Sequence, residues 1–110
     1  MKADITFRGM EHTDAIEQYV AKNLAKFKKY FGKEDPEATF IHVVLDGQLK
    51  HAIYNVEIRV KSPHFDLVAQ REGTKMYPLI DEVSHIMEAE LEKAKRKLID
   101  DIQHRDKFNV

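Results

Sequence analysis

The segment AIYNVEIRVK, residues 52–61, alternates between apolar and polar side chains along almost its whole length. Successive residues of a β-strand point to opposite faces of a sheet, so an extended chain sorts these side chains onto two sides. One side carries Tyr54, Val56, Ile58 and Val60, and the other carries Asn55, Glu57, Arg59 and Lys61. The alternation therefore predicts a strand with one buried face and one face in water.

Three other segments also have the character of strands. Residues 3–7, ADITF, alternate in the same way. Residues 39–48 are rich in β-branched and aromatic side chains up to the turn signal Asp46-Gly47. Residues 64–70, HFDLVAQ, follow a break at Ser62-Pro63. The sequence thus predicts four strands.

Two segments have the period of an α-helix instead. Residues 16–31 place apolar side chains at intervals of three or four, with Thr13 or Asp14 available to cap the start and Gly32 near the end. A loop, GKEDPEA, follows at residues 32–38. A second apolar stripe begins near Thr74 and predicts a helix of about 30 residues. Pro78 is acceptable there only in the first turn.

This order, β-α-β-β-β-α, predicts an α+β fold in which both helices pack on one face of a four-stranded sheet. Each helix has a single apolar stripe and the clearest strand has a single apolar face, so one layer of helices is sufficient to bury them. We expect the first two strands to share the sheet and the later hairpins to be antiparallel. The expected organisation is one domain over residues 1–104 and a flexible C-terminal tail over residues 105–110.

Composition and motifs argue against an enzyme. The chain has no cysteine, which excludes disulfides and thiolate chemistry and suits a reducing cytoplasm. Its start is not a secretory signal, and no segment has the roughly 20 apolar residues of a membrane-spanning helix. The histidines lack metal-binding spacing, and Ser84 and His85 are adjacent, so they point in different directions on a helix. We expect no catalytic residue, metal, cofactor, small-molecule substrate or membrane partner.

The segment AKNLAKFKKYFGK, residues 21–33, is rich in lysine and has no acidic residue, although the whole chain has a formal net charge of −1. On a helix, Lys22, Lys26 and Lys29 form one stripe, with Lys28 beside it and Lys33 beyond the helix end. Such a stripe is typical of a face that binds phosphate, and also of an ordinary solvated helix face.

The second helix has its acids early and its bases late. This arrangement suits the helix dipole and allows ion pairs such as Glu92 with Arg96. If the two helices pack side by side, Lys93, Arg96 and Lys97 extend the lysine stripe of the first helix.

Two groups of residues, one in each helix, together with the order of elements, carry a family resemblance over about residues 2–98. They are Thr13, Ala15, Ile16, Lys26, Lys29, Tyr30 and Phe31 in the first helix, and Met76, Tyr77, Ile80, Asp81 and Glu82 in the second. On these residues the chain resembles the ribosome hibernation-promoting factors, also called ribosome-associated inhibitor or factor Y proteins. Because the chain ends soon after the second helix, it is similar to their short form.

The resemblance implies a translation silencer that acts in the cytoplasm under stress and in stationary phase. It implies binding to the small ribosomal subunit in the decoding channel for mRNA and tRNA, with basic helix faces on ribosomal RNA phosphates. It assigns such contacts to Lys22, Lys26, Lys29 and Lys93. With the rest of both basic faces, the predicted RNA-binding set is Lys22, Lys26, Lys28, Lys29, Lys33, Lys93, Arg96 and Lys97.

The chain departs from the family at three positions that are usually basic, namely Asn23, Ile86 and Ala89. Each lost phosphate contact removes about one unit of salt dependence. If Ile86 and Ala89 are exposed, they form a small apolar patch. The alternative is therefore a protein-interaction module on the same fold that has lost ribosome binding, and a weaker one is a regulator that recognises another RNA by shape. The sequence leaves the oligomeric state open.

Overall fold

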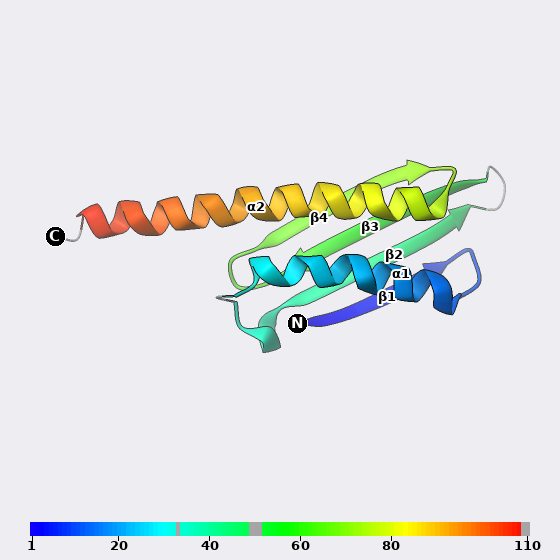
Figure 1. The fold of residues 1–110 in the computed structure, drawn as a ribbon, viewed down its shortest axis with the longest axis horizontal. Helices are drawn as coiled ribbons and strands as arrows, with labels where there is room; N and C mark the ends of the chain where they lie inside the picture. The colour runs from blue at the N-terminus through cyan, green and yellow to red at the C-terminus, as the bar shows by residue number, and fades with distance from the viewer. Residues whose placement is uncertain (33, 49–51, 109–110) are drawn as a thin grey trace.

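The computed structural model describes residues 1–32, 34–48 and 52–108. Its sheet contains β1 (Lys2–Arg8), β2 (Phe40–Gln48), β3 (Ile53–Lys61) and β4 (Asp66–Gly73), in that spatial order. β1 and β2 are parallel, and the other two pairs are antiparallel. Figure 1 shows α1 (Asp14–Ala25) and α2 (Met76–Phe108) on one face of the sheet. The predicted α+β architecture is confirmed.

The core lies between the sheet and the two helices. The alternation in β3 places Val56, Ile58 and Val60 there, each at most 1% exposed. α2 adds the buried side chains of Met76, Leu79, Ile80, Val83, Met87 and Leu91. Pro78 lies in the first turn of α2, as expected. Leu91 is the last buried residue of α2 within residues 76–103, and Ala94 is partly buried against the core.

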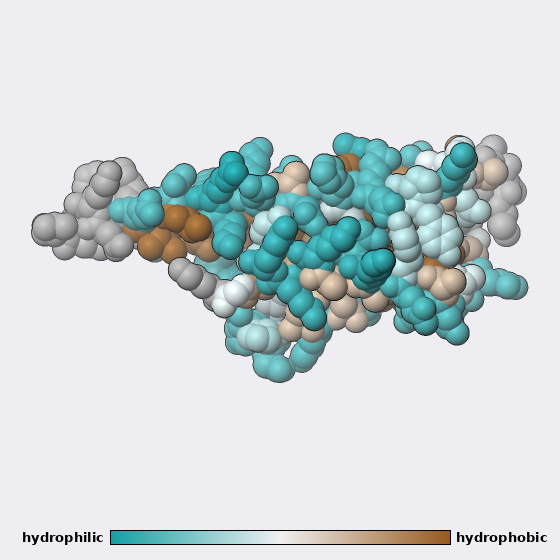
Figure 2. All heavy atoms as spheres, viewed as in Figure 1, coloured by the Kyte–Doolittle hydropathy of each residue, from teal (hydrophilic) through white to brown (hydrophobic). Residues whose placement is uncertain are grey.

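The C-terminal part of α2 projects beyond the sheet, as Figure 1 shows, and the molecule measures 61 × 24 × 17 Å. Ile99 and Ile102 are exposed on this part, and Figure 2 shows an apolar patch there. α2 is helical through Phe108, and residues 109–110 lie outside the described residues. The domain boundary at residue 104 and the flexible tail over residues 105–110 therefore stay predictions.

The first helix is shorter than predicted. It begins after Thr13, whose hydroxyl accepts a hydrogen bond from the Ile16 amide at 3.2 Å, as its capping pattern indicated. The α-helix ends at Ala25 instead of near Gly32, and Lys26–Tyr30 continue as a 3₁₀ turn, η1. Phe27 within this turn is fully buried. Because η1 has three residues per turn rather than 3.6, it changes where the lysine side chains point.

Glu34 joins the segment after η1 to the connection between β3 and β4. Its buried carboxylate accepts hydrogen bonds from Ser62 Oγ at 2.5 Å and from the His64 amide at 3.0 Å, and it lies 2.6 Å from His64 Nδ1. Burial alone would raise the pKa of Glu34, but these hydrogen bonds together lower it from its ordinary value of 4.5. The loop predicted here also contains a short 3₁₀ turn, η2 (Pro36–Ala38).

Candidate nucleic-acid interface

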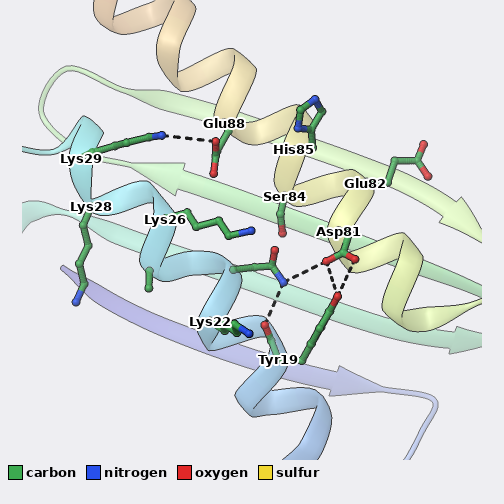
Figure 3. A pocket seen from close by; sticks show the side chains of 12 residues that line it. Tyr19, Lys22, Lys26, Lys28, Lys29, Asp81, Glu82, Ser84, His85 and Glu88 are labelled. Carbon is green, nitrogen blue, oxygen red and sulfur yellow. Dashed lines mark hydrogen bonds and ion pairs between the residues drawn. The ribbon is translucent and has the colours of Figure 1, made fainter.

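A groove of about 1090 Å³ separates α1 and η1 from α2. One wall carries the lysines, and the other belongs to the first half of α2, as Figure 3 shows from close by. Four of the predicted RNA-binding residues line this groove, namely Lys22, Lys26, Lys28 and Lys29. Lys33, a fifth, lies outside the described residues.

The winding of the chain directs three of these lysines into the groove. Lys22 lies one α-helical turn before Lys26, and Lys26 and Lys29 are three residues apart in η1, where side chains at that spacing eclipse each other. Figure 3 shows Lys26 and Lys29 extending toward α2, whereas Lys28 points away from it. The predicted stripe of Lys22, Lys26 and Lys29 is therefore present, although a 3₁₀ turn forms part of it.

The wall opposite the lysines is acidic. Asp81, Glu82 and Glu88 line it, and Lys29 Nζ lies 4.0 Å from Glu88 Oε2. An ion pair this long, with the lysine side chain 65% exposed, contributes at most about 1 kcal/mol. Lys22 and Lys26 form no ion pair within the part of the chain that the structure describes. The groove is thus mixed in charge, with two unpaired lysines on one side.

A hydrogen-bond network that the sequence did not indicate joins the two helices. The Tyr19 hydroxyl donates to the Asp81 carboxylate at 2.7 Å, and Asn23 Nδ2 donates to the Tyr19 carbonyl at 3.1 Å and to Asp81 Oδ1 at 3.4 Å. The hydrogen bond to Asp81 raises the pKa of Tyr19. Asn23 is buried and acts as a helix-packing residue, which explains why this position is not basic here.

The bases of the second helix do not extend the lysine stripe. Lys93, Arg96 and Lys97 line a separate depression of about 380 Å³ that is formed by α2 alone. Arg96 pairs with Glu92 at 2.7 Å, as predicted from their spacing. Lys95 is the base that reaches η1, because its Nζ donates a hydrogen bond of 3.4 Å to the Lys29 carbonyl. The predicted set therefore occupies two surfaces rather than one.

The apolar patch considered for Ile86 and Ala89 is not formed as expected. Ile86 is partly buried and packs against the core, and only Ala89 is exposed. Ile86 thus contributes part of its side chain to the core instead of standing free on the surface. The alternative of a protein partner on this side therefore loses its main surface feature.

His12, Asp14 and Glu17 form a small exposed cluster at the start of α1, with His12 Nε2 2.6 Å from Glu17 Oε2. The sequence did not indicate it, because the three residues have no recognised metal-binding spacing. The N-terminus of a helix carries a partial positive charge, which opposes binding of a cation. We assign these contacts to hydrogen bonding at the helix start.

Comparison with known families decides the relationship. The family model for the Sigma 54 modulation protein / S30EA ribosomal protein family matches residues 3–99. The chain belongs to this family. The match confirms the resemblance to hibernation-promoting factors. S30EA proteins are ribosome-associated factors and are not known as enzymes.

Two solved structures share the S30EA fold with this chain. A ribosomal subunit interface protein from Coxiella burnetii superposes with a TM-score of 0.70 at 24% identity, covering 87% of this chain and 99% of that chain. The N-terminal domain of Thermus thermophilus Protein Y has a TM-score of 0.68 and 29% identity, covering 84% of this chain and 93% of that chain. Among the residues described in the present structure, no helix has the length and apolar character needed to span a membrane.

Proposed function

We propose that this protein binds the small ribosomal subunit at the decoding channel and thereby silences translation. The observation that carries the proposal is the wall of Lys22, Lys26 and Lys29, which directs three cations to one side in a member of a ribosome-associated family. Lysines arranged in this way neutralise phosphates of an RNA backbone. A protein in the decoding channel excludes mRNA and tRNA by occupying their space, so it needs no catalytic group.

The second surface, with Lys93, Arg96 and Lys97, adds further phosphate contacts in this proposal. All three side chains are exposed, and only Arg96 is paired among the described residues. Lys28, which points away from α2, and Lys33 complete the proposed contacts. We further propose that the protein acts in the cytoplasm during stress and stationary phase, which is supported by its family alone.

The test is cosedimentation of the purified protein with small ribosomal subunits across a salt series, with large subunits as the control. The three lysines of the wall alone imply a log–log slope of about −2 to −3, and the second surface makes it steeper, so affinity should fall at least roughly 20-fold between about 50 and 200 mM salt. A lack of binding to small subunits at the lowest salt, or binding that does not depend on salt, would contradict the proposal.

Glu88→Gln is expected to increase affinity for small subunits about two- to fivefold at about 0.1 M salt. Glu88 is the carboxylate nearest to Lys29, so it competes with a phosphate for that lysine. The matched control is Glu90→Gln, which removes the same charge from an exposed position outside the groove. Equal gains in the two variants would show that only net charge matters, and the assignment of Glu88 would then be wrong.

A further inference from the structure

Ser84 places a hydroxyl group without a hydrogen-bond partner against the groove between the helices. The residue is 5% exposed, lines the groove, and its Oγ is the buried side-chain polar atom without a partner in the described part of the chain. Figure 3 shows Ser84 pointing from α2 toward the lysine wall, while His85 points away. No imidazole or carboxylate of the described residues hydrogen-bonds the hydroxyl, as activation for attack would require, so we assign it a role in binding.

A buried hydroxyl without a partner is unfavourable, because it has given up water without gaining a protein contact. Buried polar groups of this kind are rare in folded proteins, and a bound ion, water or ligand is one way in which such a group gains its partner. Lys26 extends toward Ser84 across the groove in Figure 3. Because Lys26 is exposed and flexible, a change of its rotamer gives a ligand access to the hydroxyl.

The two walls together restrict the chemistry of that ligand. Lys22, Lys26 and Ser84 all offer donors, and these suit a phosphate group. Asp81 and Glu88 lie on the same α2 face as Ser84, one turn to either side of it, and they are acceptors that repel a bare anion. A ligand that combines a phosphate with hydroxyl or amino donors complements both walls, whereas inorganic phosphate complements only one.

We propose that the groove between α1 and α2 binds a nucleoside phosphate. Its phosphate lies against Lys22, Lys26 and the Ser84 hydroxyl, and its ribose hydroxyls or base amino groups donate to Asp81 and Glu88. The groove, at about 1090 Å³, has room for such a ligand. The same chemistry is offered by a free nucleotide and by one nucleotide of an RNA strand. This site is defined by the groove alone and does not depend on ribosome binding.

The experiment is an NMR titration of the ¹⁵N-labelled full chain with inorganic phosphate, AMP and a short single-stranded RNA. We expect AMP to shift the amides of Asn23, Ser84 and His85 and to bind at least about tenfold more tightly than inorganic phosphate. Ser84→Ala should weaken AMP binding roughly fivefold and Lys26→Ala roughly tenfold. Lys61→Ala is the matched lysine control, because Lys61 is exposed on β3, outside the groove and outside the proposed RNA-binding set, and it should leave the affinity unchanged.

Ser84→Ala is a suitable variant because it removes a hydroxyl that makes no hydrogen bond and introduces a better helix former. Its circular dichroism and urea midpoint serve as the check on folding. RNA binding that depends on Ser84 and Lys26, without AMP binding, would support the site and identify an RNA strand as the source. Binding that is unchanged in both variants, or inorganic phosphate binding as tightly as AMP, would overturn the proposal. Neither result alters the outcome of the subunit cosedimentation, so the two proposals can fail separately.

Discussion

Replacing Lys26 and Lys29 together by glutamate is expected to weaken binding to small ribosomal subunits by at least about 100-fold at about 0.1 M salt. A charge-assisted hydrogen bond to phosphate contributes about 1.5–3 kcal/mol, and the variant loses two of them. It also places two new negative charges against the RNA backbone. The log–log salt slope should fall by roughly two units relative to the unmodified protein.

The matched control for this variant is Arg59→Glu/Lys61→Glu. These two bases are exposed on the open face of the sheet, opposite the helices, and their reversal changes the net charge by the same amount. Cosedimentation of this control should remain close to that of the unmodified protein. If both double variants lose binding equally, attraction depends on net charge rather than on the lysine wall, and the proposed interface is wrong.

Glu34→Ala is expected to lower the free energy of unfolding by about 3 kcal/mol. The side chain of Glu34 is only 2% exposed, and its removal leaves the Ser62 hydroxyl and the His64 amide without their acceptor. In urea denaturation followed by circular dichroism, this loss corresponds to a decrease of roughly 1–3 M in the midpoint. Because Glu34 follows η1, the lysine segment should also become more mobile in hydrogen exchange.

The same carboxylate predicts how stability depends on pH. The pKa of Glu34 is lowered in the folded protein from its ordinary value of 4.5. Its contribution is therefore complete above about pH 4.5 and is lost as the pH falls through the folded-state value. The difference in unfolding free energy between the unmodified protein and Glu34→Ala should shrink as the pH is lowered from about 5 toward 3.

Glu37→Ala is the control for Glu34, because it removes a carboxylate three residues away that is 82% exposed and pairs with Lys2 at 3.3 Å. Its effect should stay within about 0.5 kcal/mol. A Glu34→Ala variant as stable as Glu37→Ala would show that the hydrogen bonds of Glu34 with Ser62 and His64 do not stabilise the fold. So would a stability difference from the unmodified protein that does not change with pH.

Local patterns were sufficient to predict the order of elements and the side of each that is buried. Alternation in residues 52–61 identified β3 and its core face, and the apolar stripes identified both helices. The cap at Thr13 and the pair of Glu92 with Arg96 were also correct. These features depend on residues within one or two turns of each other, where the backbone geometry alone decides which side chains are neighbours.

The change from α-helix to 3₁₀ turn after Ala25 was not predicted, because the apolar side chains at Leu24, Phe27 and Phe31 are spaced as in a continuous α-helix. The hydrogen bonds of Glu34 with Ser62 and His64 join residues about 30 positions apart, so no local pattern indicates them. The side of α2 that faces the lysines was also unknown, because several rotations of an amphipathic helix are compatible with one apolar stripe.

By itself, the sequence determined the α+β order, the core positions and the alignment of Lys22, Lys26 and Lys29 along one side of the chain. Only the tertiary structure decided that Asp81, Ser84 and Glu88 stand opposite those lysines and that Lys93, Arg96 and Lys97 lie elsewhere. Tyr19 and Asp81, which meet across the groove, are 62 residues apart. Their contact follows from the packing of both helices on a shared sheet, and that packing fixes helix rotation where periodicity cannot.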